Sequence, residues 1–181
     1  SEVTPSAALL LGEIALEAGL PSGILNVVTG LGATTGKWLV EHPGVRMVSF
    51  TGGTSTGRTI GMIAAERLIP VALELGGKSP HIVFDDANLE AAAENIMGGI
   101  FEGSGQSCVA GSRLFVQRGV YDKLVALLVD RASRIRVGLP DVEGSEMGPL
   151  ASFAQRKRVE HYVESARAEG GQILVGGKRP V

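Results

Sequence analysis

Residues 45–75, VRMVSFTGGTSTGRTIGMIAAERLIPVALEL, contain the pattern that decides the fold. A β-rich run at 45–50 leads through glycines into apolar residues at helical spacing over 54–67, and an apolar run at 70–75 follows. Two strands joined by a helix pack as a right-handed crossover with the strands parallel. The stretch therefore predicts the α/β fold class.

The same alternation of helices and strands extends to both sides of this stretch. Thr4 is expected to cap the first helix with its hydroxyl and Pro5 to open it, and the helix is expected to bury one apolar stripe. A change in character after Gly76 places a domain boundary there, between 1–76 and 77–181. The other predicted helices are 33–41, 88–101, 121–135 and 159–166, and the other predicted strands are 24–28, 82–84 and 113–116.

Composition limits the partners of the chain. The 181 residues carry a formal net charge of −2, from 17 Lys and Arg against 19 Asp and Glu. Nucleic acids and anionic membranes require a clustered positive field, so neither is an expected partner. No apolar run approaches the roughly 20 residues that cross a bilayer. A small molecule is the expected partner.

The cysteine and histidine residues further restrict the kinds of site and the cellular compartment that we expect. A single Cys excludes an intramolecular disulfide, which favours a reducing, cytoplasmic compartment. The three His residues lack metal-ligand spacing, so no metal site is expected. The chain has no initiating Met and ends in turn-like residues at 176–181, which leads us to expect a piece of a longer protein.

The first segment that could carry chemistry is FTGGTSTG at 50–57, where a predicted strand passes through glycines into a predicted helix. Such a junction presents unpaired N–H groups and the positive end of the helix dipole, which suit a phosphate or pyrophosphate. The segment matches neither the P-loop nor the GxGxxG pattern. A tight strand-to-helix turn without a ligand is the alternative interpretation.

The second segment is LELGGKSP at 73–80, in which Glu74 lies between two leucines at a strand end. Burial there would penalise the charged carboxylate and raise its pKa toward the range useful for a general base. Alternatively, Glu74 faces water or pairs with Lys78.

The third segment is GQSCVAG at 105–111, which carries Cys108 in a glycine-rich loop between a helix and a strand. Exposed backbone N–H dipoles there would stabilise a thiolate, the nucleophilic form of cysteine. The alternative is an inert cysteine that packs as a small apolar residue.

These segments, in this order, resemble the NAD(P)-dependent aldehyde dehydrogenase superfamily. LELGGKSP matches the glutamate signature of that family, and the 34-residue step from Glu74 to Cys108 matches its separation of general base and nucleophile. PSGILNVVTG at 21–30 is similar to a stretch of the family's cofactor domain. The resemblance covers essentially all of the chain, as the middle of a family protein of about 500 residues.

The resemblance implies the second half of a Rossmann-like cofactor-binding domain at 1–76, followed by the start of an α/β catalytic domain at 77–181. It implies that Cys108 attacks an aldehyde, that a hydride passes to the nicotinamide, and that Glu74 activates water to hydrolyse the resulting thioester. The Cys108 N–H would be one oxyanion donor. A homodimer or homotetramer in the cytoplasm is also implied, whereas this stretch alone is expected to be inactive.

The resemblance also implies a set of cofactor-binding residues. Glu2 aligns with an acidic residue at the adenosine ribose, whose charge disfavours a 2′-phosphate and hence favours NAD over NADP. Gly53 stands where many members have Ser, and Gly103 where Asn is common. A CoA-acylating relative and a noncatalytic fragment are the alternatives. The positions carried over are Glu2, Trp38, Thr51, Gly52, Gly53, Thr54, Leu75 and Gly76.

Overall fold

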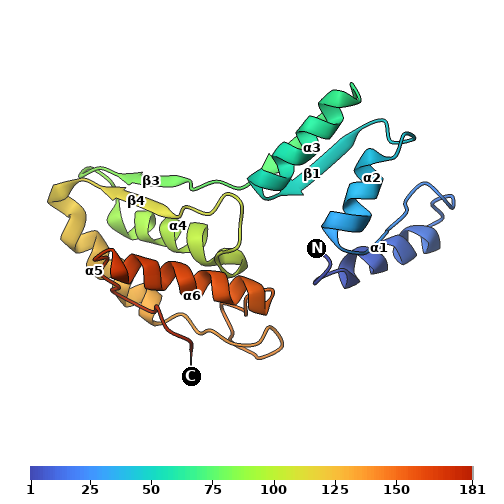
Figure 1. Ribbon diagram of the computed structural model, residues 1–181. Coiled ribbons are helices and arrows are strands. Elements are labelled where there is room, and N and C mark those ends of the chain that lie inside the picture. Colours follow the sequence, from blue (N-terminus) through green and yellow to red (C-terminus); the bar gives the residue numbers. More distant parts are fainter. Residues whose placement is uncertain (181) are drawn as a thin grey trace. The chain divides into compact units, whose positions relative to one another are not determined.

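A computed structural model describes residues 1–180. The chain folds into two compact units, the first ending at Gly76 and the second beginning at Gly77. Figure 1 shows the elements of each unit in chain order. Parallel strand pairs with helices packed on them occur in both units, which confirms the predicted α/β fold class.

The first unit is built around the crossover predicted from residues 45–75. Strands β1 (Val48–Gly52) and β2 (Val71–Leu75) pair in parallel, with Val48 opposite Val71 and Gly52 opposite Leu75. Helix α3 (Thr54–Glu66) connects them and buries Ile60 and Ala64, as its apolar spacing predicted. The unit also contains α1 (Ser6–Glu17), the π-helical turn η1 (Gly32–Gly36) and α2 (Lys37–Glu41).

A small core and one arginine hold the first unit together. Val40 of α2, Val48 of β1 and Ile60 of α3 form a buried apolar cluster. The Arg67 guanidinium donates to the carbonyl oxygen of Val40 in α2 and to those of His42 and Val45 in the connection from α2 to β1. Arg67 thereby fixes the end of α3 against the chain that enters the sheet.

The second unit repeats the crossover. Strands β3 (Pro80–Val83) and β4 (Arg113–Val116) pair in parallel, and α4 (Leu89–Phe101) connects them through the 3-10 turn η2 (Glu102–Gly105). Its buried core consists of Val83, Ala93, Ile96 and Leu124. The unit continues with η3 (Arg118–Val120), α5 (Tyr121–Ser133) and α6 (Phe153–Ala168).

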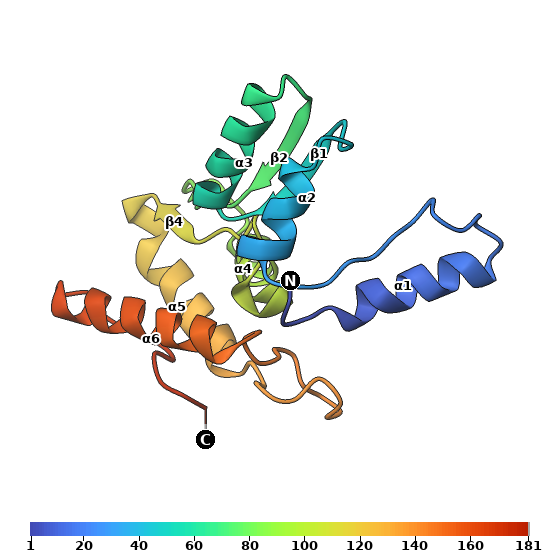
Figure 2. The ribbon, with the colours of Figure 1, turned by 45° about the vertical axis from the view of Figure 1, so that its right-hand side comes forward.

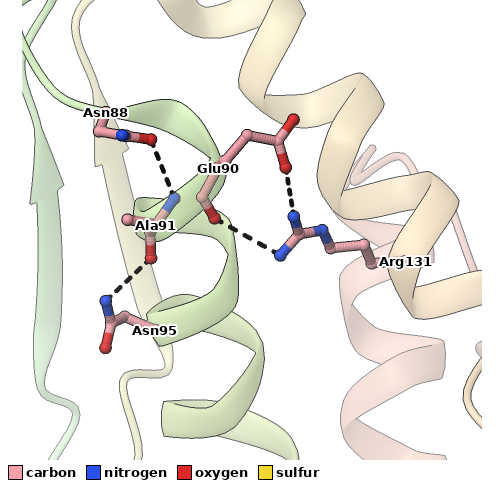
Figure 3. Close-up of polar contacts among 5 residues, drawn as sticks. All are labelled: Asn88, Glu90, Ala91, Asn95 and Arg131. Atoms are coloured by element: carbon pink, nitrogen blue, oxygen red, sulfur yellow. Dashed lines mark hydrogen bonds and ion pairs between the residues drawn. The ribbon is translucent and has the colours of Figure 1, made fainter.

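Polar contacts at the start of α4 are drawn in Figure 3. The Asn88 side chain caps the helix by accepting from the Ala91 N–H at 3.1 Å, and the Asn95 side chain donates to the Ala91 carbonyl oxygen. Arg131 of α5 forms an ion pair with the Glu90 carboxylate. These contacts fix the beginning of α4 and join it to α5.

Three local predictions for the N-terminal part were wrong. Residues 24–28 form no strand, because no neighbouring strand within residues 1–180 takes their backbone groups; Val27 instead packs against α1 at Gly12. The Thr4 hydroxyl does not cap α1, whose N-cap position is Pro5. Helix α1 has no buried residue, since no element of the first unit covers its apolar side; it stands apart from α3 in both ribbon views (Figures 1 and 2).

Several boundaries also differ from the predicted ones. Strand β1 begins at Val48 rather than at residue 45, and β3 begins at Pro80, two residues before the predicted strand. Helix α6 begins six residues before the predicted 159–166, where the Ser152 hydroxyl accepts from the Gln155 N–H. No helix within residues 1–180 has the length and hydropathy of a membrane-spanning segment.

Candidate active site

The ends of β1 and β2 bring several predicted site residues together. Gly52 lies opposite Leu75 in the parallel register, and Thr51 lies opposite Glu74. The carboxyl ends of parallel strands meet at one edge of a sheet, and ligands of α/β folds bind beyond that edge. The predicted cofactor residues Thr51, Gly52 and Leu75 therefore share one edge with the predicted base Glu74.

The turn from β1 into α3 leaves this edge open. Gly53 is the N-cap of α3, and no side chain caps the helix there. A Cβ atom added at Gly53 would meet no atom within 4 Å, and one added at Gly76 would meet none either. The first N–H groups of α3, from Thr54 onward, are thus unblocked by a cap side chain and stand at the positive end of the helix dipole. An anionic group can be bound here by backbone donors.

Gly57 determines how closely α3 approaches the strand ends. It is buried, and a Cβ atom at this position would lie 2.6 Å from Leu75 Cδ2. Only a glycine permits this contact between the first turn of the helix and the last residue of β2. Gly57 was not predicted to have a role of its own; the signal for it was a glycine inside a predicted helix.

Glu74 is exposed, so the burial expected from its leucine neighbours is not found. Side chains alternate along a strand, and Leu73 and Leu75 lie beside Gly61 and Gly57 of α3. Glu74 therefore projects from the opposite face of β2, which α3 does not cover. The carboxylate is accessible to water at the strand end.

Glu2 and Trp38 are not joined to the strand ends. The Glu2 carboxylate is exposed and accepts from the Ser1 hydroxyl at 3.4 Å. Trp38 lies on α2 with 68% of its surface exposed. Within residues 1–180, no hydrogen bond links either side chain to residues 51–54 or 74–76.

In the second unit, Cys108 lies exposed in a turn. The Ala110 N–H donates to the Ser107 carbonyl oxygen at 3.2 Å, which closes the turn around Cys108 and Val109. The structure records no hydrogen bond from the Cys108 N–H to residues 1–180. Both the thiol and this backbone donor are available to a ligand.

Directly after this turn, the chain contacts α4. Ala110 is buried, and the Gly111 N–H donates to the Gly99 carbonyl oxygen of α4 at 3.0 Å. A Cβ atom at Gly111 would lie 1.8 Å from Nε2 of His81, a buried nitrogen that has no partner within residues 1–180. The imidazole thus occupies the space beside Gly111. Gly111 is the last residue of the segment 105–111 predicted around Cys108, whereas no sequence signal had assigned His81 to the site.

Within residues 1–180, no three His, Cys, Asp or Glu side chains are grouped so that they could hold a metal ion. The groups available for chemistry are an exposed thiol, an exposed carboxylate and an edge of open backbone donors. A thiol can attack an electrophilic carbon, a carboxylate can accept a proton, and backbone donors can bind phosphate.

Comparison with known proteins shows the family to which the chain is similar. The family model described as the aldehyde dehydrogenase family matches residues 1–181. An aldehyde dehydrogenase structure from Burkholderia cenocepacia, described as putative, is 46% identical, with a TM-score of 0.97 over 99% of this chain. The NAD+ complex of betaine aldehyde dehydrogenase from Staphylococcus aureus is 42% identical, with a TM-score of 0.95 over 100% of this chain. The NAD+ complex of an aldehyde dehydrogenase from Bacillus cereus is 42% identical, with a TM-score of 0.97 over 99%.

The chain spans 37% of the length of the Burkholderia and Bacillus chains and 36% of the Staphylococcus chain. The match of the family model over the full length and the close agreement with these folds lead to one conclusion. This chain belongs to the aldehyde dehydrogenase family.

Proposed function

We propose that the protein oxidises a small aldehyde to its carboxylic acid with NAD+, and that Cys108 is the nucleophile and Glu74 the general base. The observation that carries this proposal is the exposed thiol of Cys108, in a turn with a free backbone donor, in a chain of the aldehyde dehydrogenase family. The similar Staphylococcus and Bacillus structures are complexes with NAD+, which supports the choice of cofactor.

The first step is addition of the Cys108 thiolate to the aldehyde carbon. A carbon–sulfur bond forms, and the carbonyl π electrons move to oxygen, which gives the oxyanion of a thiohemiacetal. Charge that develops on this oxygen requires a hydrogen-bond donor, and the unengaged N–H of Cys108 is suitably close to the attacking atom to be one. The turn from Ser107 to Ala110 thus presents nucleophile and donor together.

Bound NAD+ would supply the acceptor for the hydride on the carbon attached to sulfur, which would leave that carbon as a thioester with Cys108. The open edge of the first unit fits the cofactor's phosphates, because the uncapped α3 start and Gly53 leave backbone donors accessible. We assign Gly52, Gly53 and Thr54 to the pyrophosphate, with Thr51, Leu75 and Gly76 beside them.

The adenosine end of the cofactor involves residues outside this edge. We assign Glu2 to the adenosine ribose and Trp38 to the neighbourhood of the phosphates. Since a carboxylate at the ribose repels a 2′-phosphate, NAD is favoured over NADP.

Glu74 acts in the last step. Its carboxylate accepts a proton from water as the water oxygen attacks the thioester carbon. The carbon–sulfur bond breaks, so that the carboxylic acid is released and Cys108 leaves as the thiolate, and Glu74 returns its proton to solvent. The exposed position of Glu74 gives water the access that this step requires. Under this proposal residues 1–76 serve cofactor binding and residues 77–181 carry the nucleophile, in a cytoplasmic homodimer or homotetramer.

NADH formation by the full-length protein tests the proposal. Wild-type protein is expected to form NADH with an aldehyde and NAD+, and the variant C108A to form none, because alanine has no nucleophilic atom to attack the aldehyde carbon. Turnover by C108A would contradict the assignment. Omitting and adding CoA separates the CoA-acylating alternative, in which thiolysis needs no base: strict dependence on CoA would refute the hydrolytic step assigned to Glu74.

A further inference from the structure

The backbone just before the Cys108 turn adopts a conformation that L-residues rarely take. Gly103, Ser104 and Gly105 have φ angles of +61°, +59° and +70°, three consecutive left-handed residues. Glycine takes this conformation without cost, whereas a residue with a Cβ atom pays about 1–2 kcal/mol. Ser104 is one of two non-glycine residues with positive φ within residues 1–180.

The side chain of Ser104 offsets this cost with a long-range contact. Its hydroxyl donates to the Gly148 carbonyl oxygen at 3.0 Å, in a partly buried position 44 residues along the chain. Two residues after Ser104, the Gln106 side-chain oxygen accepts from the Ala151 N–H at 3.3 Å. The segment from Gly148 to Ala151 thus holds the chain that leads into Cys108 at two points.

The segment that accepts the Ser104 hydroxyl is itself fixed. The Glu146 carboxylate accepts from the backbone N–H of Arg136 at 3.0 Å and from its guanidinium at 3.2 Å. The Glu146 N–H and the Met147 N–H both donate to the Arg136 carbonyl oxygen, and the Gly138 N–H donates to the Met147 carbonyl oxygen. Gly148 follows directly, so Ser104 is bound to an anchored segment.

We propose that Ser104 is a positioning residue for Cys108, whose hydroxyl holds the left-handed backbone against Gly148 and so orients the Ser107–Ala110 turn. The proposal rests on the proposed role of Cys108 as nucleophile. Without the Ser104 hydroxyl, the left-handed segment keeps its conformational cost and loses its tether. The turn that carries the thiol and the Cys108 N–H then samples other orientations, in which attack on a carbonyl is misaligned.

Kinetics of three variants of the full-length protein test this role. S104A removes the hydroxyl, and S104G removes it while relieving the left-handed strain. S133A is the matched control, because the Ser133 hydroxyl also donates to a backbone carbonyl, that of Asp130, but within its own helix end. We expect kcat to fall about ten-fold in S104A and in S104G, as one lost hydrogen bond allows, with the KM for NAD+ unchanged. S133A should retain the wild-type kcat.

Hydrogen exchange measures the same tether without reference to activity. The hydrogen-bonded amides of this segment, those of Gln106, Ala110 and Gly111, should exchange about ten-fold faster in S104A than in wild type, and those of α5 at the wild-type rate. Unchanged exchange would overturn the tether. If S104A exchanges faster but keeps the wild-type kcat, the positioning role is overturned. It is also overturned if S104G alone keeps the wild-type kcat. A wild-type protein that oxidises no aldehyde would refute the proposed function, and exchange would still decide whether Ser104 holds the turn.

Discussion

Substituting Gly111 by alanine should destabilise the second unit through a single steric conflict with His81. The new Cβ atom would lie 1.8 Å from Nε2, 2.2 Å from Cδ2 and 2.9 Å from Cε1 of the imidazole. Carbon and nitrogen atoms normally approach no closer than about 3.5 Å, so the ring or the chain at residue 111 must move by roughly 1.7 Å. Because φ at Gly111 is outside the left-handed region, backbone strain does not contribute.

The expected loss of stability follows from how closely the His81 ring is surrounded. Nε2 of His81 is buried, and Gly99 of α4 lies on another side of it, where an added Cβ atom would be 3.1 Å from Nε2. The ring therefore has no free space on these two sides, and overpacking of this kind costs about 1–3 kcal/mol. We expect G111A to lower the free energy of unfolding by about 2–3 kcal/mol. The matched control is G98A, whose Cβ atom meets nothing within 4 Å and should stabilise α4 by up to about 1 kcal/mol.

A double-mutant cycle identifies the cause. Urea denaturation of the full-length protein, followed by circular dichroism, gives the free energy of unfolding for wild type, G111A, H81A and the double variant. Removing the imidazole frees the space for the new methyl group, so the double variant should be more stable than the sum of the single effects predicts, by at least about 1 kcal/mol. Additive effects, or a G111A variant as stable as G98A, would refute the reasoning.

Three further predictions concern contacts that hold each unit. Replacing Asn88 by Ala leaves the Ala91 N–H without its cap and should cost about 1 kcal/mol in the free energy of unfolding, measured in urea. Arg67→Lys should cost about 2 kcal/mol, because an ammonium cannot reproduce the guanidinium's contacts with three carbonyls; thermal melting measures this loss. Hydrogen bonds from Arg136 lower the pKa of Glu146 below its usual value. The contribution of this carboxylate to stability is therefore present above the unfolded-state pKa and is lost as pH falls through the folded-state pKa. Urea midpoints of wild type and E146Q, measured across acidic pH, should converge as pH falls.

The sequence predicted those elements whose apolar spacing is satisfied within the chain. The crossover from β1 through α3 to β2 was predictable because Ile60 and Ala64 repeat on the face that packs on the sheet. Residues 24–28 have the composition of a strand, but strand formation depends on a neighbour, which sequence alone does not supply. The prediction that α1 buries one side was wrong for the same reason, since no element of the first unit covers that side.

The sequence indicated candidate reactive side chains, but it did not indicate the contacts that hold them in place. The motifs predicted Cys108 and Glu74 as the reactive groups, and this assignment stays a prediction. The exposure of Glu74 depends on which face of β2 it occupies. The support from Ser104 could not be predicted, because its partner Gly148 is 44 residues away. A close approach such as that of His81 to Gly111 likewise depends on packing between elements.

The most direct measurement of the central claim is mass spectrometry of full-length E74Q after brief mixing with an aldehyde and NAD+. Glutamine cannot accept the proton of water, so the acyl group should remain on the Cys108 peptide as a thioester, with one NADH formed per active site. Wild-type protein should regenerate its thiol and continue to turn over. An E74Q protein that turns over at the wild-type rate, or an acyl group on a residue other than Cys108, would contradict the account.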